Sequence, residues 1–70
     1  MTTQFVLTDG EKSIERFYSK EIVARIAMEE AFLRERNCNW YLFARTVDVG
    51  GKIQEEKEIA RRIRSNRRYA

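Results

Sequence analysis

The chain has 70 residues, of which 43% are hydrophobic, 11% are aromatic and 36% are charged, with both signs mixed. This length is enough for one helix on one small sheet, and it leaves no room for an enclosed substrate cavity with its supporting shell. One cysteine and no histidine exclude an internal disulfide and a zinc or iron site, so we expect no metal and no cofactor.

The charge is spread unevenly along the chain. Residues 1–60 carry nine Lys or Arg against eleven Asp or Glu, a balance of −2, and residues 61–70 add five arginines. The net charge of +3 therefore comes from one terminal block. The first residues lack a basic segment followed by a long apolar run, and no stretch approaches the ~18 apolar residues of a membrane span. We therefore expect a cytoplasmic protein built as a single domain over residues 1–70.

The first predicted element is a strand over Thr3–Thr8, because apolar and polar residues alternate there. Asp9-Gly10 follows it and is typical of a two-residue hairpin turn, since both central positions of that turn need a positive φ. Such a turn pairs Phe5 with Ile14. It predicts a second strand over Glu11–Tyr18.

The next predicted element is a helix over Ser19–Asn37, because Ser19 is a favoured N-cap and Asn37 can end a helix in the left-handed conformation. The alternative extends this helix back to residue 10 and replaces the hairpin. At about 100° per residue, one apolar stripe is predicted to face the sheet, and it consists of Ile22, Val23, Ile26, Ala27 and Leu33. Met28 and Phe32 fall outside this stripe. We therefore expect the helix to make a second contact, either with the end of the chain or with a partner.

Trp40–Val49 is rich in aromatic and β-branched residues and is predicted to be the longest strand. A right-handed crossover through the helix places it beside the first strand, in an antiparallel three-stranded sheet of order 2-1-3. Gly50-Gly51 breaks the pattern, and a C-terminal helix is predicted over about Ile53–Asn66, because acidic residues there precede basic ones. The alternative is a hairpin across the two glycines, which would pair Arg45 with Glu56. The predicted fold is thus α+β, a ββαβ core over residues 1–49 followed by a basic C-terminal helix and tail over residues 52–70.

The order of these signals is similar to that of small ββαβ accessory and inhibitor proteins encoded by phages and mobile elements. The resemblance lies within residues 3–49 and is carried by the turn at Asp9-Gly10, by Ser19 at the helix start and by Trp40-Tyr41 at the strand start. It implies a binding protein, often one that inhibits or adapts a host component. It transfers no functional residue to this chain.

The strongest functional signal is a group of arginines close to the end of the sequence. Its members are Arg61, Arg62, Arg64, Arg67 and Arg68. On a helix, Arg61, Arg64 and Arg68 line up at a spacing that can reach successive phosphates. We therefore expect binding to the backbone of DNA or RNA, or pairing with an acidic protein surface. Arginines at a helix C-terminus also complement its dipole, and the preceding Glu55, Glu56 and Glu58 count against a nucleic-acid site.

The alternative function is a protein-binding module that docks through its helix or through an aromatic sheet face. The candidate partner-binding residues are Phe17, Phe32, Trp40 and Leu42. A homodimer is also expected, through the sheet face or edge that bears Val6, Phe17, Trp40 and Leu42. A C-terminal helix packed over this face would instead make these residues ordinary core. No enzymatic activity is expected, because there is no histidine and because Asp9 and Asp48 stand next to or close to glycines as turn residues.

Overall fold

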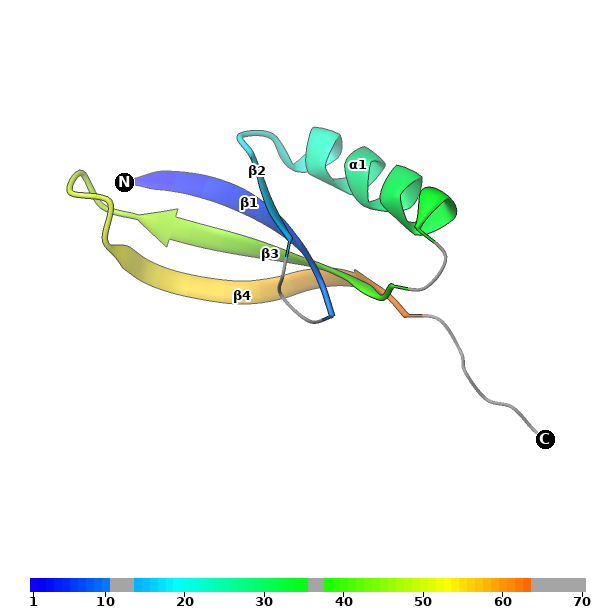
Figure 1. Cartoon of the computed structure of the whole chain (residues 1–70). Coiled ribbons are helices and arrows are strands. Elements are labelled where there is room, and N and C mark those ends of the chain that lie inside the picture. Colours follow the sequence, from blue (N-terminus) through cyan, green and yellow to red (C-terminus); the bar gives the residue numbers. More distant parts are fainter. Residues whose placement is uncertain (11–13, 36–37, 64–70) are drawn as a thin grey trace.

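Four antiparallel strands form one sheet, and one helix lies across one of its two faces (Figure 1). The computed structural model describes residues 1–10, 14–35 and 38–63. The elements in chain order are β1 (Thr2–Asp9), β2 (Glu15–Tyr18), α1 (Glu21–Arg34), β3 (Trp40–Val47) and β4 (Ile53–Arg62). The strand order across the sheet is β2-β1-β3-β4. The α+β class and the predicted order 2-1-3 of the first three strands are therefore confirmed.

The connection between β1 and β2 is longer than a two-residue turn. Phe5 pairs with Tyr18 rather than with Ile14, so the predicted register is wrong by four residues. A shift by an even number keeps every side chain on its predicted face, because side chains alternate with a period of two. Val6 and Phe17 are consequently direct neighbours on one face. The alternative long helix from residue 10 is wrong, since β2 is extended; residues 11–13 lie outside the described residues.

Both ends of α1 differ from the prediction. The N-cap is Lys20 instead of Ser19, and its extended backbone makes no side-chain capping bond. Ala24 N nevertheless donates to Lys20 O at 3.1 Å, which closes the first turn. At the other end Glu35 is also extended and its amide donates to Ala31 O at 2.8 Å. Asn37, the predicted left-handed cap, lies outside the described residues.

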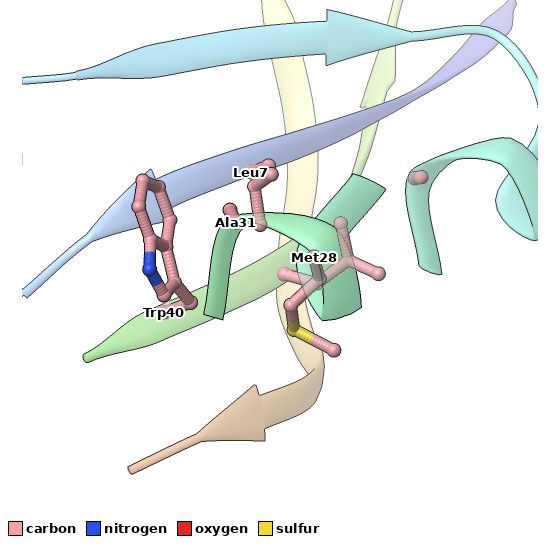
Figure 2. Close-up of a cluster of buried hydrophobic side chains, with 6 residues drawn as sticks. Leu7, Met28, Ala31 and Trp40 are labelled. Atoms are coloured by element: carbon pink, nitrogen blue, oxygen red, sulfur yellow. The ribbon is translucent and has the colours of Figure 1, made fainter. Parts of the chain in front are cut away.

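The side of α1 that packs on the sheet carries two alanines and one methionine. Ala24, Met28 and Ala31 are buried there, whereas most of the stripe predicted to face the sheet is exposed. The strands contribute most of the large side chains of the core, since Leu7, Trp40 and Leu42 are fully buried beneath the helix. Figure 2 shows Leu7 and Trp40 from the sheet beside Ala31 and Met28 from the helix. Alanine lets the helix backbone approach these large side chains, and this reverses the predicted orientation of the helix.

Trp40 and Leu42 are therefore core residues rather than partner-binding residues. Trp40 is 1% exposed and Leu42 is 0% exposed. Both point toward α1, since Leu42 pairs with Leu7 in the cluster under the helix. The indole Nε1 of Trp40 is buried and has no hydrogen-bond partner among the described residues. The prediction that these two residues form a partner surface or a dimer interface is wrong.

The segment after Gly50-Gly51 is a strand and not a helix. β4 pairs with β3 along Ile53–Arg62, and Arg45 lies opposite Glu56 as the hairpin alternative requires. The turn is built by Asp48, whose Oδ1 accepts bonds from Gly50 N and Lys52 N, both at 2.9 Å. Gly51 has a φ of 84°, which glycine adopts without the strain of a side chain. The open edge of β3 offers eight residues for pairing, which the local charge pattern could not reveal. Residues 64–66 lie outside the described residues.

Candidate interaction surfaces

The most exposed apolar surface of the described chain lies on α1, on the side away from the sheet. We call it the outward face, and it consists of Ile22, Val23, Ile26 and Leu33. Ile22 is 64% exposed, Ile26 is 53% exposed and Leu33 is 74% exposed. These three lie within about 40° of one another around the helix, directly opposite the buried alanines. The helix is therefore apolar on two opposite sides, and only one of them is covered.

Charged residues border the outward face along one flank. Arg25 Nε donates to Glu21 Oε2 at 2.8 Å, one helical turn away. Glu29 accepts two bonds from Arg62 of β4, at 2.7 and 2.8 Å. This flank is thus neutralised by pairs of opposite charge, and the other flank carries Glu30 and Arg34, both exposed.

The Glu29–Arg62 pair affects the ionisation of both partners. The hydrogen bonds from Arg62 hold the pKa of Glu29 below its ordinary value of 4.5, and the positive charge acts in the same direction. In return the hydrogen bonds to Glu29 raise the pKa of Arg62. On the other side of β4, Glu58 raises the pKa of Arg61 through a two-point ion pair. Both arginines are therefore charged and engaged within the fold.

A second surface is the face of the sheet away from α1, where no described element covers the strands (Figure 1). We call it the open sheet face, and its apolar residues are Val6, Phe17, Tyr41 and Phe43. Phe17, Val6 and Phe43 form one row across β2, β1 and β3. Phe17 is 54% exposed, whereas its neighbour Val6 is buried. Of the predicted partner-binding residues, Phe17 is thus the one placed on an open surface.

Two arginines lie over aromatic rings of the open sheet face. The guanidinium of Arg45 is 5.8 Å from the centroid of Phe17, and that of Arg61 is 5.6 Å from the centroid of Tyr41. Each is also paired with a carboxylate of β4, Arg45 with Glu56 and Arg61 with Glu58. Cation–π contacts of this kind hold arginine side chains flat against a sheet. The charges of these two arginines are therefore already neutralised within the molecule.

The predicted arginine group is not brought together as a helical row. Arg61 and Arg62 are consecutive in a strand, so they point to opposite faces of the sheet. Arg61 lies over Tyr41, and Arg62 lies over the ring of Phe32 at 5.4 Å while it pairs with Glu29. Arg64, Arg67 and Arg68 lie outside the described residues. The helical spacing from which a phosphate site was predicted does not exist at Arg61.

Phe32 lies between the two surfaces and belongs to neither. It is half-buried, it packs against the core, and the guanidinium of Arg62 covers its ring. This position makes Phe32 a poor anchor for a partner, because its exposed side is occupied by another side chain of the same molecule.

The described residues also include a hollow and side chains of the types that bind metal ions. A shallow hollow of about 260 Å³ lies at the end of the sheet, and its lining residues are Thr2, Thr3, Gln4, Phe17, Tyr18 and Ser19. Within the described part of the chain, no three His, Cys, Asp or Glu side chains gather closely enough to hold a metal ion. Nor is any helix there long and apolar enough to cross a membrane.

Sequence reasoning missed the outward face because it assigned the largest side chains to the core. The signal that could have revealed it is the placement of Ala24 and Ala31 seven residues apart with Met28 between them, a narrow row of two alanines and one unbranched side chain on one side of the helix. No family model, curated protein or solved structure matches the chain.

Proposed function

We propose that this chain is a small non-enzymatic protein-binding module that docks on another protein through the outward face of α1. The observation that carries the proposal is the exposure of Ile22, Ile26 and Leu33 on a helix whose opposite side is already packed. Single exposed apolar residues are common, but an aligned group of β-branched and leucine side chains on one helix is typical of a binding surface.

The expected partner is a protein with an apolar groove that accepts one face of a helix. In this mode of recognition, anchors at successive turns of the helix enter the groove while charged residues remain at its rim. Ile22 and Ile26 are one turn apart and Leu33 lies two turns further on. The Glu21–Arg25 pair then forms part of the rim. An accessory or inhibitory role toward a host protein, which the sequence resemblance implies, fits this mode of binding.

The test is a photo-crosslinking amino acid placed at Ile26, in cells from which the protein comes, followed by identification and purification of the crosslinked protein. Binding to that purified partner is then measured for the unmodified chain, for Ile26→Ser and for Val49→Ser. Val49 is the matched control, because it is fully exposed at the β3–β4 turn and far from α1 in the sequence. We expect Ile26→Ser to weaken binding about tenfold or more and Val49→Ser to leave it unchanged. Equal binding by all three proteins, or a loss confined to Val49→Ser, would contradict the proposal.

A second candidate function is binding to single-stranded nucleic acid. The observation in its favour is the open sheet face, where exposed Phe17 and the Arg61–Tyr41 pair offer ring and guanidinium surfaces on which bases can stack. Against it, Arg45 and Arg61 are each neutralised by a glutamate of β4.

The two candidates are separated by a mobility-shift assay with mixed-sequence single-stranded DNA and RNA at physiological salt. The full chain is compared with a variant in which Arg64, Arg67 and Arg68 are replaced by serine. This variant keeps Arg61 and Arg62, which belong to β4. If nucleic acid is the target, the full chain shifts the probe and the variant does not, with affinity that falls steeply as salt rises. If protein is the target, neither protein shifts it.

A further inference from the structure

The outer edge of β4 is the longer of the two sheet edges. β4 has ten residues, whereas β2 at the other edge has four. Among the described residues no strand pairs with β4 on the side away from β3. The backbone groups along such an edge are free to pair with another extended chain.

The charges of β4 are arranged so that the strand is complementary to itself. Glu55 and Glu56 lie in its first half, and Arg61 and Arg62 end it. If a second β4 lies antiparallel to the first, with the symmetry axis between residues 58 and 59, Glu56 falls opposite Arg61 of the second copy. Glu55 then falls opposite Arg62 of the second copy. Opposite charges in directly facing positions stabilise an antiparallel pair, and like charges destabilise it.

The register of β4 against β3 shifts at two places, and the shift at Ile59 places these charges on matching faces. Glu56 and Arg61 are five residues apart, so in a regular strand they would point to opposite faces. The register shifts at Ile59, where Ala60 pairs with Leu42 and Glu58 pairs with Phe43. Because of this extra residue, Glu56 and Arg61 both lie on the open sheet face. Glu55 and Arg62 both lie on the α1 side by the same argument, so each of these two charge pairs shares a face, while the bulges of the two copies meet at the axis, where Glu58 faces Ile59.

We propose that a second copy of this chain pairs with the first through β4, antiparallel, so that the two sheets become one. On the open sheet face the existing pairs Arg45–Glu56 and Glu58–Arg61 then meet their counterparts and form a row of alternating charges across the junction. On the α1 side, Glu55 makes no ion pair with a described residue of its own chain and gains Arg62 of the second copy. This surface is separate from the outward face of α1, so the proposal does not rest on the proposed function.

The test is sedimentation equilibrium with a charge swap. Glu55→Arg/Glu56→Arg makes β4 carry arginine at all four positions, and Arg61→Glu/Arg62→Glu makes it carry glutamate at all four. We expect the unmodified chain to dimerise, each double variant alone to associate at least about tenfold more weakly, and an equimolar mixture of the two to recover the dimer. Recovery in the mixture requires both variants to be folded, and their Trp40 emission is recorded as a separate check of the core.

Ile26→Ser serves as the control in the same experiment. It leaves β4 intact, so we expect its dimer to be as strong as that of the unmodified chain. The proposal is overturned if the unmodified chain is a monomer at high micromolar concentration, if the mixture of charge variants fails to associate although both keep a native Trp40 emission, or if Ile26→Ser is the variant that abolishes association.

Discussion

Arg62 on β4 holds Glu29 on α1 through two hydrogen bonds of 2.7 and 2.8 Å, across 33 positions of the sequence. The same guanidinium lies over the ring of Phe32. The pair fastens the flank of the helix to the last residue of the last strand. Both side chains remain about half exposed, so the pair orients the helix more than it stabilises the fold.

The Glu29–Arg62 pair predicts a dependence of stability on pH. The pKa of Glu29 is lower in the folded chain than its ordinary 4.5, mainly because of the hydrogen bonds from Arg62. Its contribution is therefore fully present above pH 4.5 and is lost as the pH falls through the folded-state pKa. As the pH is lowered from 4.5, we expect the free energy of unfolding to fall less for Glu29→Gln than for the unmodified chain, as measured by urea unfolding. Glu30→Gln is the control, since Glu30 is exposed and forms no ion pair with a described residue.

Truncation of Trp40 is expected to destabilise the fold much more than truncation of Phe17. Trp40→Ala should lower the free energy of unfolding by about 3–5 kcal/mol, because it empties the middle of the core. Phe17→Ala should cost about 1 kcal/mol or less, since more than half of its side chain is in water. Urea unfolding followed by circular dichroism measures both. A larger loss for Phe17 than for Trp40 would contradict the assignment of the core.

The two faces of α1 can be distinguished by a similar pair of variants. Met28→Ala should destabilise the fold by about 2 kcal/mol or more, because it leaves a cavity against the sheet. Ile26→Ala should change stability by no more than about 0.5 kcal/mol, as alanine favours helix and the isoleucine is exposed. Thermal unfolding of the two variants gives the comparison. If Ile26 proves the costlier residue to truncate, the outward face is covered in solution.

The geometry of the β3–β4 turn predicts that substitution of Gly51 costs more stability than substitution of Gly50. Gly51→Ala should cost about 1 kcal/mol, because an alanine at a φ of 84° is strained. Gly51→Asn should cost less, since asparagine tolerates this conformation. A Cβ at Gly50 meets only Asp48 Oδ1, at an ordinary distance of 3.5 Å, so Gly50→Ala is the milder change. Unfolding midpoints in the order Gly50→Ala, Gly51→Asn, Gly51→Ala, from high to low, would agree with this account.

The first two thirds of the fold follow from short-range signals. Alternation over Thr3–Thr8 and the aromatic segment from Trp40 locate β1 and β3, which run over Thr2–Asp9 and Trp40–Val47. The handedness of the crossover then sets the order of the first three strands. The register of β2 could not be predicted in the same way, because Asp9-Gly10 fixes a register only when the turn has two residues.

The end of the chain was assigned to a helix because a bulged strand resembles one locally. Ile59, Ala60 and Ile63 recur at helical intervals, and Glu58 stands four residues before Arg62. An extra residue at Ile59 breaks the alternation that would have indicated a strand. Arg45–Glu56 was available as a long-range signal, since the hairpin alternative pairs these two residues. The candidate arginine site was misplaced for the same reason. In a strand Arg61 and Arg62 point to opposite faces, whereas the prediction placed Arg61 in a helical row.

The alanines beneath α1 have a consequence for how the molecule opens. Separation of α1 from the sheet exposes two alanines and one methionine of the helix together with Leu7, Trp40 and Leu42 of the strands, but it breaks no strand ladder. Separation of β1 from β3 breaks a ladder of eight facing pairs. We therefore expect α1 to open more readily than the strands. Its amides should exchange with deuterium through partial openings, whereas those of β1 and β3 should exchange only on global unfolding. A protein that covers Ile22, Ile26 and Leu33 would suppress these openings. Slower amide exchange in α1, without a change in β1 and β3, would then report that this surface is occupied.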